Sequence, residues 1–145
     1  MISAAVRPRG PFSLRLSARL AANATRTSGG GPFTAALAAG GIGRAWQQPN
    51  GVVQLRAPDE AGLSELRFVL ALDDDHSEFL TRFRDDPLLG RALPRLRGYR
   101  PVRLATVTHA VLKAVAGQLI TARRARDSER TVIRAATPQL PGTFL

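Results

Sequence analysis

The segment from residue 107 to residue 136 constrains the fold most, because it contains two helical hydrophobic patterns separated by a glycine. Apolar residues recur at helical spacing upstream at Val107, Val111, Ala114 and Val115, and downstream at Ala122, Ala125, Val132 and Ile133. Between the two patterns stands Gly117, and glycine costs about 1 kcal/mol in a helix interior. The segment therefore predicts a helix, a sharp turn at Gly117 and a second helix.

The start of the second helical pattern carries polar and basic residues. Thr121 is placed to cap the helix by accepting hydrogen bonds from its unpaired backbone amides. Arg123 and Arg124 follow in the first turn, where their charges oppose the helix dipole. Cations at this end suit an anion-binding site, because helix N-terminal amides already attract phosphate. An ordinary helical hairpin with a solvated basic face is the alternative, and these residues alone favour it.

The positive charge of the chain is concentrated in its second half. The formal net charge is +10, and residues 81–145 hold 12 arginines and one lysine against four acidic residues. Residues 1–80 are nearly balanced, with eight arginines and seven acidic residues. Such asymmetry indicates a nucleic acid or an anionic membrane surface as a partner. Arginine suits phosphate chemically, although a genome rich in G and C gives the same excess over lysine.

Residues 1–80 are typical of an antiparallel α+β domain. Strands are predicted over residues 12–20, where apolar and polar residues alternate strictly, and over residues 33–39, 42–47 and 52–57. Asn50-Gly51 supplies the turn of a hairpin between the last two strands. A helix then begins after Pro58-Asp59, with an apolar stripe suited to cover one face of the sheet.

Residues 81–145 are interpreted as the beginning of a second, helical domain, with the boundary near residues 74–86. Asp75 and Glu78 form a capping box for a helix over residues 77–83. Asp86-Pro87 predicts a further helix over residues 88–93, which Pro94 should end. Thr106 is expected to cap the helix that leads to Gly117.

Several classes of site and location are disfavoured. The chain has no cysteine, which excludes disulfides, thiolate zinc sites and a cysteine nucleophile. Three adjacent carboxylates at Asp73–Asp75 cannot all face one ion, so we expect no metal there. No apolar run approaches the roughly 18 residues that span a bilayer, and Arg15 and Arg19 interrupt any signal-peptide pattern. We therefore expect no membrane association and a reducing cytoplasm.

Three segments of the second half together resemble a known family. Gly117-Gln118-Leu119-Ile120-Thr121, preceded by Asp86-Pro87-Leu88-Leu89-Gly90 and by Leu96-Arg97-Gly98-Tyr99-Arg100-Pro101, is similar to the alkylbase DNA glycosylases. These are the 3-methyladenine DNA glycosylase II type of the helix-hairpin-helix superfamily. The strand at Pro11-Phe12-Ser13-Leu14 and the later hairpin resemble that family's N-terminal domain, which is similar to half of a TATA-binding protein. The likeness extends over residues 8–136.

The resemblance implies a role for individual residues. Family members extrude a damaged base from double-stranded DNA and cleave its N-glycosidic bond, without a cofactor, in the bacterial cytoplasm in association with the nucleoid. A side chain fills the space that the base leaves. This wedge falls on Leu119, with Gln118 beside it at the gap, and Thr121, Arg123 and Arg124 as phosphate contacts. Leu20 matches a wall of the base pocket.

The chain departs from the family pattern in its catalytic part. The helix-hairpin-helix and the catalytic aspartate of the family lie downstream of the segment matched here. Beyond Gln118 the acidic residues are Asp127 and Glu129, and neither stands in a matching motif. We therefore expect an N-terminal portion, with no catalytic residue of its own, that contacts damaged DNA and has a C-terminal half as a further partner. A small basic nucleic-acid-binding protein without enzymatic activity is the alternative.

Overall fold

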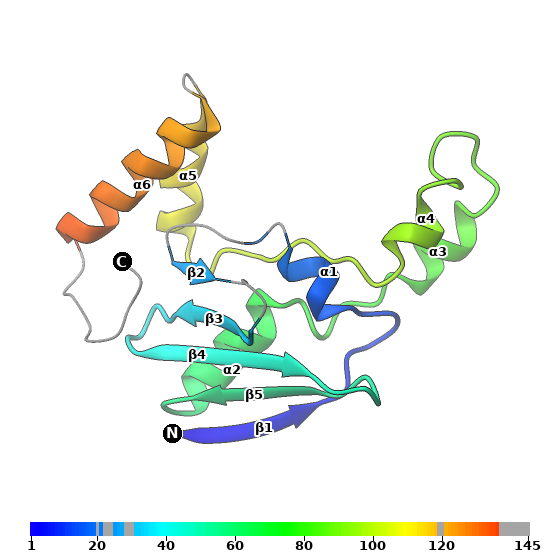
Figure 1. Cartoon of the computed structure of the whole chain (residues 1–145), viewed down its shortest axis with the longest axis horizontal. Helices are drawn as coiled ribbons and strands as arrows, with labels where there is room; N and C mark the ends of the chain where they lie inside the picture. Colours follow the sequence, from blue (N-terminus) through cyan, green and yellow to red (C-terminus); the bar gives the residue numbers. More distant parts are fainter. Residues whose placement is uncertain (20, 22–24, 28–30, 119–120, 137–145) are drawn as a thin grey trace.

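The structure is a computed structural model, and it describes residues 1–145 except 20, 22–24, 28–30, 119–120 and 137–145. Five antiparallel strands form one sheet in the order β1-β5-β4-β3-β2. The strands are β1 (Ile2–Val6), β2 (Arg26–Thr27), β3 (Phe33–Ala36), β4 (Ile42–Gln47) and β5 (Val53–Ala57). The helices are α1 (Leu14–Ala18), α2 (Glu60–Val69), α3 (Ser77–Arg82), α4 (Leu93–Leu96), α5 (Val107–Gln118) and α6 (Ala122–Ala136). The predicted α+β class is thus confirmed (Figure 1).

The hairpin of β4 and β5 is confirmed at its predicted position. The side-chain oxygen of Asn50 accepts a hydrogen bond from the amide of Val52 at 3.0 Å. Gly51 has a φ of 85°, which glycine adopts without steric cost. In the resulting register, Ala45 faces Leu55, and both side chains are buried.

Helix α2 covers one face of the sheet (Figure 1). Its stripe of Leu63, Leu66 and Val69 is buried, as the sequence spacing predicts. The carboxylate of Asp59 caps the helix by accepting from the amide of Gly62 at 2.9 Å. A Cβ atom on Gly62 would lie 2.9 Å from the Cβ of Ala57 on β5, so this glycine allows the helix to approach the strand closely.

The predicted strand over residues 12–20 is wrong, because residues 14–18 form α1. Ser13 caps the helix by accepting from the amide of Leu16 at 3.3 Å. Leu14, Ser17 and Ala18 are the buried residues, at the i, i+3, i+4 spacing of a helix. The edge of the sheet beside β5 is instead formed by β1, at residues 2–6, for which no strand was predicted.

Two further expectations about helices are wrong. Residues 88–92 form turns rather than a helix, and Pro94 stands in the first turn of α4 instead of ending a helix before it. Proline is tolerated there because the first amides of a helix have no intrahelical acceptor. The Asp86 carboxylate does accept from the amides of Leu88 and Leu89, both at 2.9 Å, but it closes a turn. The predicted capping box of Asp75 and Glu78 is also wrong, because His76 is the residue that precedes α3 and its side chain makes no capping hydrogen bond. Asp75 instead accepts a hydrogen bond from the amide of Ser77.

The helical hairpin of α5 and α6 follows residues 97–106 and projects away from the sheet (Figure 1). The predicted break at Gly117 is wrong, because α5 continues through Gly117 to Gln118. The cap at Thr106 is confirmed, since its hydroxyl oxygen accepts from the amide of His109 at 3.1 Å. Among the described residues, no helix has the length and apolar character that crossing a membrane requires.

Candidate nucleic-acid interface

The helical hairpin is attached to the sheet domain through the connector of residues 97–106. The amide of Ser13 donates to the carbonyl of Gly98 at 2.8 Å. Gly98 has a φ of 86°, and a Cβ there would lie 2.9 Å from the Ser13 nitrogen. The Ser17 hydroxyl accepts from the amide of Arg100 at 3.0 Å. These contacts fix the path of the connector against α1.

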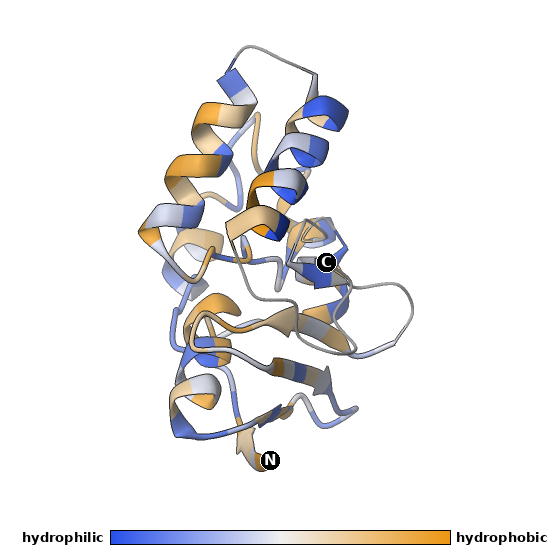
Figure 2. Ribbon diagram, turned by 90° about the vertical axis from the view of Figure 1, so that its left-hand side faces the viewer, coloured by the Kyte–Doolittle hydropathy of each residue, from blue (hydrophilic) through white to orange (hydrophobic). Residues whose placement is uncertain are grey.

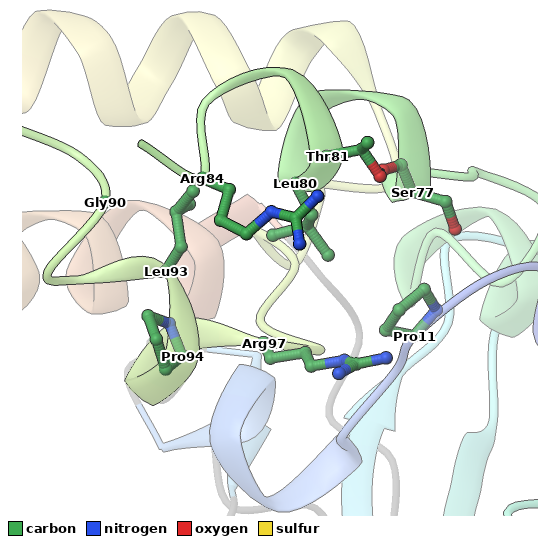
Figure 3. Close-up of a pocket in the computed structure, with 9 residues that line it drawn as sticks. All are labelled: Pro11, Ser77, Leu80, Thr81, Arg84, Gly90, Leu93, Pro94 and Arg97. Atoms are coloured by element: carbon green, nitrogen blue, oxygen red, sulfur yellow. The ribbon is translucent and has the colours of Figure 1, made fainter. Parts of the chain in front are cut away.

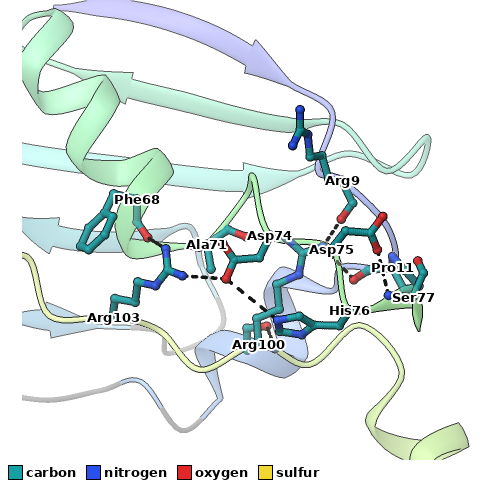
Figure 4. A network of polar contacts seen from close by, with 11 residues as sticks. Arg9, Pro11, Phe68, Ala71, Asp74, Asp75, His76, Ser77, Arg100 and Arg103 are labelled. Carbon is teal, nitrogen blue, oxygen red and sulfur yellow. Dashed lines mark hydrogen bonds and ion pairs between the residues drawn. The ribbon is translucent and has the colours of Figure 1, made fainter. Parts of the chain in front are cut away.

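Arg100 anchors the same connector from inside the protein (Figure 4). It is 1% exposed, and its guanidinium donates to the carbonyls of Arg9, Pro11 and Ala71. Its charged group also lies 5.1 Å from the centre of the Phe12 ring, a cation–π distance. Burial lowers the pKa of Arg100, partly offset by the nearby carboxylates of Asp74, Asp75 and Asp73. Arg100 thus joins the N-terminal segment, the end of α2 and the connector.

Arg103 and Arg26 hold the next part of the connector. The Arg103 guanidinium donates to the Asp74 carboxylate at 2.7 Å and lies 4.9 Å from the centre of the Phe68 ring (Figure 4). The Arg103 amide donates to the carbonyl of Val69 at 2.9 Å. Arg26 on β2 donates to the carbonyls of Val102 and Arg103, and burial lowers its pKa to about 10. Arg100 and Arg103 of the second half, and Arg26 of the first, are therefore internal supports rather than ligand contacts.

The three adjacent aspartates have separate partners. Asp73 forms a bidentate ion pair with Arg67, Asp74 pairs with Arg103, and Asp75 accepts from the amide of Ser77. Hydrogen bonding lowers the pKa of Asp73 through Arg67 and that of Asp75 through Ser77. The three carboxylates thus brace α2, the connector and α3 individually.

His109 and Glu129 join α5 to α6. Glu129 is 2% exposed, and its carboxylate contacts Nε2 of His109. Since a buried carboxylate requires a polar partner, this contact fixes which side of α6 faces inward. Ile133, one turn further along α6, is half-buried on the same side.

A neighbouring side of α6 is basic and exposed. All five arginines of the helix are exposed, and four of them share one face at successive spacings of three or four residues: Arg123, Arg126, Arg130 and Arg134. This face extends about 16 Å along the helix at about 1.5 Å per residue. Planar guanidinium groups bind phosphate oxygens in a two-pronged geometry, so the row suits a polyanion. We call these four residues the arginine face.

The four predicted site residues that the structure describes lie at the end of α5 and at the start of α6. Gln118 ends α5 and is exposed, and Thr121 directly precedes α6 and is exposed. The backbone carbonyl of Thr121 accepts a hydrogen bond from the amide of Ala125 at 2.9 Å. Arg123 is part of the arginine face, and Arg124 is exposed beside it. The predicted wedge Leu119 and the predicted pocket residue Leu20 lie outside the described residues.

The sequence patterns missed the residues that orient this surface. No pattern in the sequence predicts that His109 and Glu129 are paired, or that Arg100 is buried. A signal for the helix pair was present, because Glu129 falls among the apolar positions of α6 and not among its arginines.

An apolar stripe runs along the exposed side of α5. Figure 2 shows apolar segments along this helix and hydrophilic segments along α6. Val107, Val111 and Val115 are 80%, 56% and 67% exposed. Contiguous exposed apolar groups favour association.

We expect the protein to form concentration-dependent oligomers through this stripe. The double variant Val111→Lys and Val115→Lys should shift it towards monomer in analytical ultracentrifugation without loss of helix content, because both positions are exposed. The paired change Thr131→Lys and Ser128→Lys on exposed positions of α6 is the control for added charge. A wild-type protein that stays monomeric over a hundredfold concentration range would contradict the expectation.

Neither protein-family models nor curated protein sequences indicate a function for this chain. No family model matches the chain, and no curated protein sequence is significantly similar to it.

Proposed function

We propose that this chain binds double-stranded DNA as the N-terminal portion of an alkylbase DNA glycosylase does, with the helical hairpin as the contact surface. The observation that carries the proposal is the arginine face of α6, whose four members are all exposed while Glu129 of the same helix is buried against His109. Arginine contacts to phosphates fix the position and orientation of a protein on DNA, but carry no sequence information.

The positions of the resembling segments support the same proposal. Gln118 and Thr121, which the resemblance places beside the DNA gap, stand at the facing ends of α5 and α6. Arg123 and Arg124 follow within one turn and are exposed. An aliphatic wedge at Leu119 would therefore have phosphate-binding groups on the following helix. A sheet backed by α2 on the N-terminal side agrees with the TATA-binding-protein-like domain that the resemblance implies.

The acids after Gln118 do not suit catalysis. Glu129 is buried against His109, and Asp127 is exposed one turn from the two nearest members of the arginine face, Arg123 and Arg130. A glycosylase aspartate has to stabilise the positive charge that develops on the sugar, which requires a fixed position beside the extruded base. We therefore propose DNA contact without base cleavage by this chain.

The first prediction of the proposal concerns base release. Incubation of the purified chain with methylated DNA should release no 3-methyladenine above a protein-free control. Chromatography of the released bases measures this, with a complete glycosylase of this type as the positive control. Release that co-purifies with the chain and disappears in an Asp127→Asn variant would contradict the proposal, because it would show that Asp127 is a catalytic residue.

The second prediction tests Leu119 as the wedge. A side chain that fills an abasic gap gains contacts worth on the order of 1–3 kcal/mol, by analogy with base stacking. Leu119→Ala should therefore weaken binding to a duplex with an abasic site by about tenfold or more, and leave binding to the intact duplex nearly unchanged. Fluorescence anisotropy with both duplexes gives the two dissociation constants.

Controls separate this outcome from the alternatives. Val115→Ala, at an exposed apolar position four residues before Leu119, should leave the preference for abasic DNA intact. A melting temperature of Leu119→Ala that falls as it does for a core truncation would show that the side chain is structural. Equal affinity of the wild type for abasic and intact DNA would favour a non-catalytic basic binding protein.

A further inference from the structure

A second basic site lies on the other side of the connector from the helical hairpin. An open cavity of about 480 Å³ is lined by α3, the turns after it, α4 and Pro11 of the N-terminal segment (Figure 3). Its volume is within the range of small-molecule sites. All of the residues that line it belong to the described part of the chain.

Two arginines stand on opposite walls of this cavity. Arg84 follows α3, Arg97 follows α4, and both side chains line the space (Figure 3). No hydrogen bond or ion pair joins either guanidinium to another described residue, in contrast to Arg100 and Arg103 nearby. The Thr81 hydroxyl donates to the carbonyl of Ser77, so the guanidinium groups are the main donors available to a ligand.

The lining contains no acidic residue. Residues 77–97, which include every lining residue except Pro11, hold five arginines and three acidic residues, a formal net charge of +2. Two guanidinium groups beside one cavity repel each other unless an anion neutralises them. A phosphate monoester carries a charge of about −1.5 to −2 at neutral pH and three acceptor oxygens, whereas a carboxylate carries a single charge. A phosphate monoester therefore matches the two arginines better.

The rest of the cavity is apolar. Leu80 of α3, Leu93 and Pro94 of α4, and Pro11 supply its hydrocarbon surface. The shape of one wall depends on Gly90, where a Cβ would lie 2.4 Å from the carbonyl oxygen of Arg84 and 2.7 Å from that of Asp86. The turn after α3 is thus closed tightly against the backbone of Arg84 and Asp86.

We propose that this cavity binds a small organic phosphate monoester, with its phosphate between Arg84 and Arg97 and its apolar group against Leu80, Leu93 and Pro94. The site is separate from the arginine face and does not depend on the proposed contact with DNA. It would allow a small phosphorylated ligand to be bound at the same time as a duplex.

Calorimetric titration of the full chain with phenyl phosphate, inorganic phosphate and benzoate at neutral pH tests this proposal. Phenyl phosphate should bind most tightly, because it offers both the dianion and the apolar ring. Arg84→Gln and Arg97→Gln should each weaken its binding by about tenfold or more, as expected for loss of a charge-assisted hydrogen bond. Arg95→Gln removes the same charge from an exposed position of α4 that does not line the cavity, and should change binding less than twofold.

Three results would overturn the proposal. The first is an absence of heat with phenyl phosphate at millimolar concentration, and the second is an equal loss of affinity in Arg95→Gln, which would indicate general charge attraction. The third is benzoate binding as tightly as phenyl phosphate. Displacement of phenyl phosphate by duplex DNA would contradict the separation from the DNA surface. Unchanged circular dichroism of the variants shows that any loss reflects the site, since Arg84 and Arg97 are both exposed.

Discussion

Replacement of Arg100 by methionine is expected to lower the free energy of unfolding by about 3–4 kcal/mol, since it removes the donor from one buried and two partly buried carbonyls, at about 1–3 kcal/mol for a buried one. The affected carbonyls belong to Arg9, Pro11 and Ala71. Methionine is shorter and uncharged, so the substitution removes the cation–π contact with Phe12 together with the hydrogen bonds. For a chain of this length the melting temperature should fall by about 10–15 °C.

Urea denaturation followed by circular dichroism measures this effect. Arg95→Met is the matched control, because Arg95 is exposed and lies only five residues earlier, in α4. It should change the free energy of unfolding by less than about 0.5 kcal/mol. Arg100→Lys should lie between the two, since one ammonium group cannot donate to three carbonyls on different segments. Equal stability of Arg100→Met and Arg95→Met would contradict the role of Arg100 as the anchor of the connector.

Elements specified by neighbouring residues were predictable from the sequence. The β4–β5 hairpin follows from Asn50-Gly51 between two apolar runs, and α2 follows from the cap at Asp59 and its apolar stripe. The cap at Thr106 and the extent of α6 were also found in this way. In each case the stabilising contact joins residues within four positions of each other, so it can be recognised from a short stretch of sequence.

Ambiguous patterns caused the errors. The alternation over residues 12–20 contains Leu14, Ser17 and Ala18, which also fit a helix, and the cap at Ser13 decides between the two. At Gly117 the cost of about 1 kcal/mol for glycine was outweighed, and the helix continues by one more residue. Residues 2–6 form a strand because β5 pairs with them, which their own short sequence does not show.

The internal supports of the candidate interface could not be predicted. Arg100 contacts residues 29, 89 and 91 positions away, and His109 contacts Glu129 across 20 positions. Only the fold brings such groups together. An arginine that binds DNA and one that holds a connector look the same in a sequence, so the charge count of the second half overestimates the basic surface.

The central claim is that the arginine face of α6 is the surface that contacts DNA. Salt dependence of binding counts such contacts, because each phosphate neutralised contributes about 0.9 to the slope of log affinity against log salt concentration. The test variant changes all four members of the face to glutamine: Arg123, Arg126, Arg130 and Arg134. The control variant changes four exposed arginines elsewhere to glutamine, which removes the same net charge. They are Arg15 of α1, Arg19 directly after it, Arg44 of β4 and Arg56 of β5.

The decisive measurement is the anisotropy of a labelled intact duplex titrated with wild type, test variant and control variant over a range of salt concentrations. The arginine-face variant should bind with a slope smaller than that of the wild type by about three to four, with a correspondingly large loss of affinity at low salt. The control variant should retain a slope within about one of the wild-type value. A slope reduced equally in both variants, or unchanged in the arginine-face variant, would contradict the assignment of α6 as the DNA-contacting surface.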